Sequence, residues 1–231
     1  MAFEQDITQL VRSSDHLTEL TDSTIDAIHA RMILAEQEIE AHIHQAKLKM
    51  PFYRLSRNQT LTSVGAAGSP PDYWASGSGV TYTVVDTVKH HVDWVDRSPM
   101  QQELLTAMGR KNLRYVFVEF HIWRIDWVDD PRTELLYQQV ALSTPVTVAA
   151  MTKMLSGSCT SFLAHGATNE WGLSGVYMAP NNDWGYEMIH PIKQSGSGSM
   201  LIALPAAVAG DVPLDAKNWW TFPYIGSSQN L

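Results

Sequence analysis

The sequence is poor in cysteine, in basic side chains and in long apolar runs, and each shortage excludes a class of protein. The single cysteine, Cys159, allows no disulfide within the chain and no thiolate cluster for zinc or iron–sulfur ligation. Lys and Arg total 16 against 24 Asp and Glu, so the net charge of -8 does not supply the basic surface that DNA or RNA binding requires. The longest apolar run, residues 200–209, is too short for a membrane-spanning helix, which needs about 20 residues. We therefore expect neither a nucleic-acid-binding protein nor a membrane-inserted one.

Signals for secretion and for catalysis are also missing. The N-terminus, Met1 to Asp6, lacks the basic and then apolar pattern of a signal peptide, so we expect a soluble protein made in a cytoplasm. Neither a nucleophile motif of the G-x-S-x-G type nor a phosphate-binding glycine loop occurs. The histidine pairs His42/His44 and His90/His91 have spacings that place the two rings on different faces of a helix or a strand. We expect no enzyme, no cofactor and no metal site within one chain.

Glycine is absent between Phe3 and Met50, and no proline precedes Pro51. Because Ala, Gln, Glu, Leu, Ile and Met dominate this stretch, the composition predicts helix over residues 1–50. Two polar clusters, at residues 13–15 and 21–24, carry side chains suited to helix N-caps. One long helix with a weak point and two consecutive helices are therefore both allowed, and we favour a break near Ser13 or Asp22.

The second part of this helical stretch carries a heptad repeat. Residues at the a and d positions recur over about three heptads, and they are Ile25, Ile28, Met32, Ala35, Ile39, His42 and Ala46. Such a stripe must be buried, either against the rest of the chain or against identical helices of other copies. A polar core residue, His42, favours the oligomer because it can fix the register, and Ile at both a and d favours three strands over two. The repeat thus predicts a short coiled coil that joins copies of the chain.

The pattern changes after Pro51. Glycines and prolines such as Gly65, Gly68 and Pro70 predict a hinge or linker loop over residues 51–78. From Gly79 onward, β-branched residues and alternating patterns predict strands, punctuated by one short helix at residues 98–109. The expected strands lie near residues 80–85, 113–128, 139–148, 173–178 and 200–204. We predict a mainly antiparallel β-sandwich over residues 79–231, so the fold class is α+β.

All eight tryptophans follow the helical stretch. Trp123 and Trp127 share one face of a strand and are predicted to lie in the core. Trp171 and Trp184 differ, since each precedes a glycine in a polar context that contains, respectively, Asn169 and Asp183. A flat ring beside amide and carboxylate groups could stack on a sugar and bond its hydroxyls, so these four residues form a candidate glycan platform; capping of the sandwich core is the alternative.

A glycan hydrolase is a further alternative, with Glu119, Asp126 or Glu170 as its carboxylates. Glycoside hydrolysis needs two such groups about 5–9 Å apart, and a sequence does not reveal that separation.

The heptads from Ile25 to Ile39, the hinge at residues 62–73 and the Trp-rich β-domain from Gly79 together form an arrangement that resembles the fibre and receptor-binding proteins of tailed bacteriophages. The resemblance implies a homotrimer whose N-terminal helices join other tail or baseplate proteins of the virion. It also implies that the β-domains meet a glycan or protein on the host surface. The implied function is that of a structural tail protein, a fibre or baseplate appendage with a role in host attachment, made in the host cytoplasm. A monomeric carbohydrate-binding module and a glycan hydrolase stay open as alternatives.

Overall fold

The computed structural model describes residues 2–49, 52–116, 118–130, 134–141, 143–180, 186–194 and 196–224, and only the backbone of residues 2, 4, 43–49 and 186. The chain divides into two compact units, Met1–Pro51 and Phe52–Leu231. The first unit is helical, and the second contains mainly antiparallel β-sheets that do not close into a barrel. The predicted α+β fold class is therefore confirmed.

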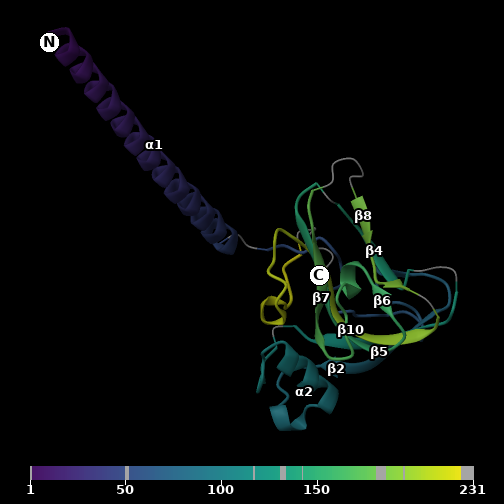
Figure 1. Cartoon of the computed structure of the whole chain (residues 1–231). Helices are drawn as coiled ribbons and strands as arrows, with labels where there is room; N and C mark the ends of the chain where they lie inside the picture. Colours follow the sequence, from purple (N-terminus) through teal and green to yellow (C-terminus); the bar gives the residue numbers. More distant parts are fainter. Residues whose placement is uncertain are drawn as a thin grey trace. The chain divides into compact units, whose positions relative to one another are not determined.

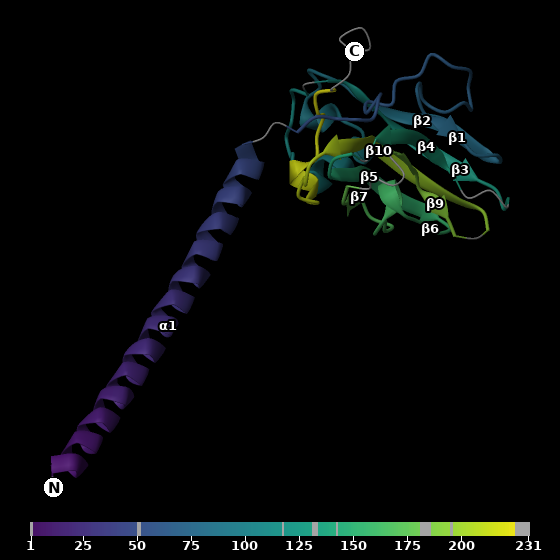
Figure 2. The ribbon, with the colours of Figure 1, turned by 90° about the horizontal axis from the view of Figure 1, so that it is seen from above.

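The first unit is one helix, α1 (Ala2–Lys49), which runs without interruption for 48 residues and is about 72 Å long (Figure 2). The predicted break near Ser13 or Asp22 is wrong. The hydroxyl groups of Thr18, Thr21 and Thr24 donate to the carbonyl oxygens four residues earlier, at 2.7–3.0 Å. Threonine can cap a helix or bond back into it, and here it does the latter, so the helix continues.

The centre of the second unit is a five-stranded antiparallel sheet with the strand order β2-β3-β10-β5-β7. Figure 1 labels its strands β2, β5, β7 and β10. Its strands are β2 (Val80–Val88), β3 (Phe120–Trp127), β5 (Val146–Ser156), β7 (Gly172–Met178) and β10 (Gly198–Ala209). Two smaller sheets complete the β-structure: β1 (Ala75–Ser76), β4 (Leu136–Ala141) and β8 (Tyr186–Ile189) form one, and β6 (Cys159–Thr160) and β9 (Ile192–Lys193) form the other. The helical segments are η1 (Trp94–Asp96), α2 (Pro99–Ala107), η2 (Phe162–Ala164) and η3 (Ala216–Asn218).

Two of the predicted strands are too long. Residues 113–116 form no strand, and β3 begins only at Phe120, although the predicted run is largely apolar. The run at residues 139–148 belongs to two strands, because Val140 lies in β4 and Val146 begins β5. An apolar run records burial and does not by itself distinguish a strand from a packed loop.

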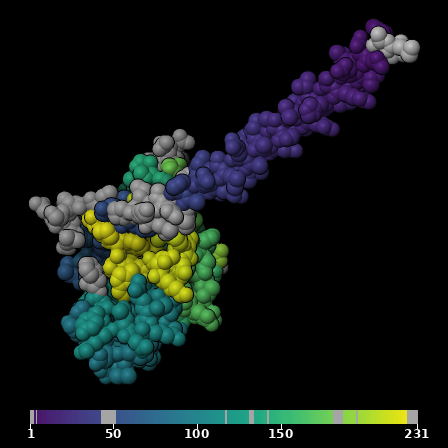
Figure 3. All heavy atoms as spheres, turned by 90° about the vertical axis from the view of Figure 1, so that its left-hand side faces the viewer, coloured from purple at the N-terminus to yellow at the C-terminus, as the bar shows by residue number. Residues whose placement is uncertain are grey.

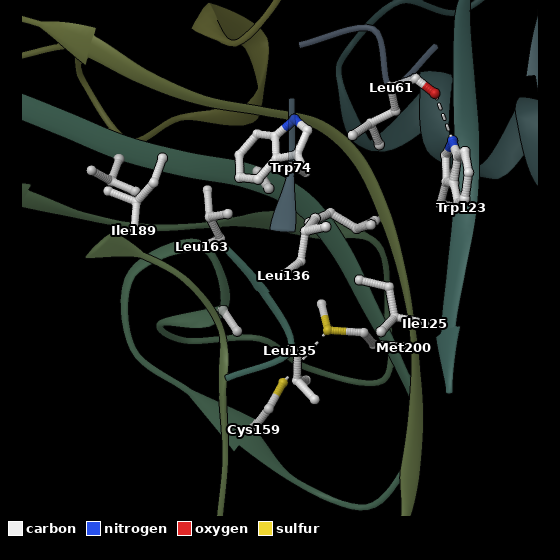
Figure 4. Packing of buried hydrophobic residues seen from close by; sticks show 14 of the residues in the cluster. Leu61, Trp74, Trp123, Ile125, Leu135, Leu136, Cys159, Leu163, Ile189 and Met200 are labelled. Atoms are coloured by element: carbon white, nitrogen blue, oxygen red, sulfur yellow. Dashed lines mark hydrogen bonds between the residues drawn. The ribbon is translucent and has the colours of Figure 1, made fainter. Parts of the chain in front are cut away.

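The central sheet carries a core on each face. Alternate residues of β3 divide between the two cores: Trp123, Ile125 and Trp127 enter the first, while Phe120 and Ile122 enter the second. The first core lies between the central sheet and the smaller sheets, and Figure 4 shows the indole of Trp123 donating to the carbonyl oxygen of Leu61 at 2.8 Å. The second core is covered by α2 and by the C-terminal residues 212–222. This is the layered arrangement of a sandwich, with a helix and an extended segment completing the second face.

Residues 52–78 do not form a linker, which corrects the prediction for residues 51–78. They belong to the second unit, where Leu61 is fully buried and Trp74 is 4% exposed. The amide of Leu55 donates to the carbonyl oxygen of Ala207 in β10 at 2.8 Å. Glycine and proline in this stretch give an irregular backbone, and that irregular backbone is packed against the β-domain.

Gln59 fastens the C-terminal segment to the β-domain. Its amide nitrogen donates to the carbonyl oxygen of Trp220 at 2.6 Å, and its amide oxygen accepts from the backbone nitrogen of Phe222 at 2.9 Å. The indole of Trp219 donates to Leu204, a residue with a φ of +52° at an irregularity in β10. Figure 3 shows the C-terminal residues, in yellow, at the surface of the β-domain. The last described residue, Tyr224, is thereby held against the segment that follows Phe52.

Candidate self-association helix and candidate ligand-binding residues

The predicted oligomerisation residues lie along one stripe of a continuous helix. Ile25 is 44% exposed, Met32 is 56% exposed and Ile39 is 58% exposed. Ile28, Ala35 and His42 are exposed as well, and the side chain of Ala46 lies outside the described residues. Burying one large aliphatic side chain contributes about 1.5–3 kcal/mol, so an exposed stripe of this length favours a partner.

The stripe continues to the N-terminus of α1, where the sequence predicts a short apolar stripe from the spacing of Phe3, Ile7, Leu10 and Leu17. Apolar and small polar residues follow one another at spacings of four and three from the first turn onward, in the order Phe3, Ile7, Leu10, Ser14, Leu17, Thr21 and Ile25. Two consecutive spacings of four occur at Leu17, Thr21 and Ile25. Such a 3-4-4 step is a stutter, which locally unwinds a left-handed supercoil without ending the helix. The sequence predicts the apolar spacing from Phe3 to Leu17, but the polar residues Ser14 and Thr21 obscure its continuity with the heptads that begin at Ile25.

Charges beside the stripe are compatible with parallel copies. In the heptad frame of Ile25, Arg31 occupies a g position and Glu36 occupies the following e position. In a parallel, in-register coiled coil, a g residue faces the e residue five positions further along the neighbouring helix. Arg31 of one copy would therefore face Glu36 of the next, which is an attractive pair.

The predicted glycan platform is not assembled by the described residues. Trp171 is only 7% exposed, and its ring packs in the second core with Met151 and Leu201, so its prediction as an exposed stacking surface is wrong. Asn169 lies exposed in the turn before β7. Asp183 and Trp184 lie outside the described residues. Trp171 thus follows the alternative reading, in which a tryptophan at a strand end closes the core.

The carboxylates of the hydrolase alternative do not all converge. Glu119 directly precedes β3 and accepts a hydrogen bond from the amide of His90 at 3.2 Å. Asp126, near the other end of β3, pairs with Arg124 at 2.8 Å. Seven residues of extended strand separate the backbones of Glu119 and Asp126 by about 23 Å, which is too far for a catalytic pair. Glu170 is exposed in the turn before β7.

The adjacent histidines do not lie on a strand. His90 and His91 occupy a turn after β2, and their rings meet edge to face with centroids 3.9 Å apart. His90 Nδ1 lies 2.6 Å from the carbonyl oxygen of Val116, and the ring of Tyr115 contacts both imidazoles. Within the described part of the chain, no group of three or more His, Cys, Asp or Glu side chains is arranged to hold a metal ion.

The single cysteine is placed for packing. Cys159 is buried, and its sulfur lies 3.4 Å from the sulfur of Met154 and 3.7 Å from that of Met200, as seen for Met200 in Figure 4. Burial raises the pKa of the Cys159 thiol to about 12, so the thiolate that would act as a nucleophile is scarce at neutral pH.

One cluster of charged and aromatic residues was not singled out from the sequence. Arg54 and Arg57 converge on Tyr224, and Arg57 also lies over the ring of Tyr73. These residues span 170 positions of the chain, from Arg54 to Tyr224, and no local pattern links them. The fold alone brings them together.

The geometry thus defines an α+β protein with a long helix that carries an apolar stripe and a β-domain with two packed cores. A comparison with known protein families and with curated proteins finds no match to this chain. No helix within the described ranges combines the length and the apolar character needed to cross a membrane.

Proposed function

We propose that this protein is a non-enzymatic structural protein that self-associates through α1 and presents its β-domain as a binding head. The observation that carries the proposal is the exposed stripe of α1, which extends from Phe3 to His42 along an uninterrupted helix. The setting proposed for it is the tail of a virion, as a fibre or baseplate appendage with a role in host attachment.

The argument for self-association is energetic. An isolated helix gains little stability from its own hydrogen bonds, and most helical stability in proteins comes from packing of an amphipathic face. Thr18 and Thr21, near the middle of α1, add little helix propensity, so the apolar positions on either side must supply the stabilisation. A second copy of the same helix offers the same spacing, the same stutter and the complementary pair Arg31 and Glu36. Identical helices are therefore the occupant that fits the stripe best.

The number of copies proposed is three. Isoleucine occupies both a and d positions, at Ile25, Ile28 and Ile39, and this pattern shifts the preference of a parallel coiled coil from two strands toward more. In a trimer, His42 would form a polar layer that fixes the register. Three β-domains would then be carried on one stalk, which multiplies weak contacts with a surface by raising the effective concentration.

The experiment is light scattering coupled to size exclusion on the full chain and on two double variants. Ile28→Glu with Ile39→Glu places charge in the stripe, and Ala30→Glu with Ala41→Glu places the same charge on the opposite face of α1. We expect an oligomer for the wild type and the Ala variant, and a monomer for the Ile variant. A monomeric wild type at micromolar concentration would contradict the proposal and leave a monomeric carbohydrate-binding module as the alternative.

A further inference from the structure

Two arginines share one tyrosine on the β-domain. Arg57 Nε donates to the hydroxyl of Tyr224 at 3.1 Å, and the guanidinium carbon of Arg54 lies 5.4 Å from the centroid of the same ring. On its other side, Arg57 lies over the ring of Tyr73, with its guanidinium carbon 5.2 Å from the centroid. Four side chains from three separate stretches of sequence thus form one cluster, the arginine–tyrosine cluster.

The backbone beneath the cluster is fixed. The amide of Arg54 donates to the carbonyl oxygen of Pro223 at 2.7 Å. Arg57 is held by Gln138 of β4 in both directions, because its amide donates to the side-chain oxygen at 2.7 Å and its carbonyl oxygen accepts from the side-chain nitrogen at 3.1 Å. The backbone that carries the two guanidinium groups is therefore fixed before any ligand arrives.

Tyr73 is presented outward by a strained turn. Its φ is +67°, a left-handed conformation that is uncommon for a tyrosine, and its side chain is 55% exposed. Both neighbours are anchored to Asn58, which donates to the carbonyl oxygen of Asp72 at 2.7 Å and accepts from the indole of Trp74 at 3.2 Å. Strain held in place by surrounding bonds is a feature of binding sites.

Among the described residues, no carboxylate compensates the charge of the cluster. Neither Arg54 nor Arg57 forms an ion pair with a carboxylate among the described residues, whereas Arg124 pairs with Asp126. Arg97, by contrast, has hydrogen-bond acceptors within the fold. Its guanidinium donates to three oxygen atoms, from Lys89, Gln101 and Leu113.

Arg54 differs, because its Nε is buried without a hydrogen-bond partner in the described part of the chain. Burial lowers the pKa of Arg54, and the hydrogen bond with Tyr224 raises that of Arg57. A buried donor without an acceptor is costly, and an oxygen of a bound anion would remove that cost.

We propose that the arginine–tyrosine cluster binds the carboxylate or phosphate group of an acidic glycan. The two guanidinium groups recognise the oxyanion through charge-assisted hydrogen bonds, and the exposed ring of Tyr73 lies beside the sugar. A nucleic acid is a poorer fit, because the chain carries a net charge of -8 and the cluster offers only two cations. The inference rests on the proposed attachment function and identifies the class of ligand for the β-domain.

The test is affinity electrophoresis of the full chain through native gels that contain polygalacturonate, teichoic acid or dextran. These polymers carry carboxylates, phosphodiesters and no charge, respectively, so the gels separate the two sources of an oxyanion from neutral sugar. We expect retardation by at least one acidic polymer, weaker at high salt, and none by dextran. Arg57→Gln should reduce the affinity about tenfold or more, since a hydrogen bond between charged groups is lost. The matched control, Arg124→Gln, removes an exposed arginine that already has a carboxylate partner and should bind as the wild type does.

The proposal is overturned if Arg124→Gln loses as much binding as Arg57→Gln does. It is also overturned if dextran retards the wild-type protein as strongly as the acidic polymers do, or if none of the acidic polymers retards it. If Arg57→Gln loses the native near-UV spectrum, Tyr73→Ala becomes the deciding variant, because its exposed ring supports no core. Reduced affinity of folded Tyr73→Ala supports the proposal, and unchanged affinity overturns it. Light scattering on the same samples separates this result from the proposed function: an oligomer that binds no glycan refutes the ligand alone, and a monomer that binds refutes self-association alone.

Discussion

Gly198 leaves room for the indole of Trp127 at the end of the central sheet. A β-carbon added at Gly198 would overlap the six-membered ring of Trp127 and would lie 2.8 Å from the carbonyl oxygen of Ser156. Gly157, on the neighbouring strand end, has a φ of +72° and faces the same ring. The burial of the large apolar ring of Trp127 thus depends on two glycines, which have no side chain.

Gly198→Ala should therefore destabilise the β-domain by about 1–3 kcal/mol, the usual cost of forcing an extra methyl group into a packed core. The measurement is the free energy of unfolding from urea titrations. Gly172→Ala is the matched control, because Gly172 also lies at the start of a strand and a β-carbon there meets no atom within 4 Å. We expect that variant to stay within about 0.5 kcal/mol of the wild type. Equal losses at both positions would show that the Trp127 ring is not the cause.

His190 makes the stability of the β-domain depend on pH. It is 8% exposed, its ring lies against Phe162, and burial lowers its pKa below the usual 6.5. In the unfolded chain the imidazole takes up a proton at the higher, ordinary pKa, so the unfolded state binds more protons in this range. The free energy of unfolding should fall as the pH is lowered from about 7 through 6.5 toward the folded pKa. Urea titrations at pH 7.5 and 5.5 measure the fall, which should be smaller in His190→Gln than in the wild type. His165→Gln, at an exposed position, should leave the fall unchanged; a fall that is also unchanged in His190→Gln would refute the role of His190.

At the scale of elements, the sequence predicts segments with a periodic pattern correctly, but it does not predict which distant segments pack against them. The helix over residues 1–50, the start of β2 and the extent of β7 follow from composition and alternation, because those signals are local. The continuity of α1 at Thr21 was missed, since a threonine hydroxyl can bond forward as a cap or back into the helix. The burial of Trp171 and the packing of residues 52–78 depend on strands that are distant in sequence. The arginine–tyrosine cluster could not be predicted from the sequence for the same reason.

The orientation of the helices in the proposed coiled coil can be tested through Arg31 and Glu36. In a parallel, in-register arrangement these residues face each other between copies, so Arg31→Glu should weaken the oligomer by about 0.2–1 kcal/mol per pair, the range for exposed ion pairs. The double variant Arg31→Glu with Glu36→Arg restores opposite charges and should recover the wild-type stability. The measurement is the concentration dependence of thermal unfolding at low and high salt, with the single variant Glu40→Arg, at a position away from the stripe, as the control. The single variant Glu36→Arg is measured as well. If the effects of Arg31→Glu and Glu36→Arg simply add in the double variant, the two residues do not form a direct pair, and another orientation of the helices is favoured.

On the scale of the whole molecule, the proposed surface for self-association lies on one unit of the chain, and the two packed cores lie in the other. Both cores of the β-domain consist of residues after Phe52, and the two ends of the domain are joined to each other. Leu55 bonds to Ala207 in β10, and Arg54 bonds to Pro223 in the C-terminal segment. Nothing in these cores requires residues of α1, so the β-domain should keep its fold when the helix is removed.

Residues 52–231 expressed alone should therefore be a folded monomer. Because the proposed interface lies entirely on α1, its removal should turn an oligomer into single chains while the tertiary structure around the tryptophans persists. Light scattering gives the mass, and the near-UV circular dichroism of the tryptophans reports the packing. Thermal unfolding of the shortened chain should not depend on protein concentration, whereas that of the full chain should, since dissociation is coupled to unfolding only when copies associate. A shortened chain that remains oligomeric would place the interface on the β-domain and would remove the reason for assigning self-association to the stripe of α1.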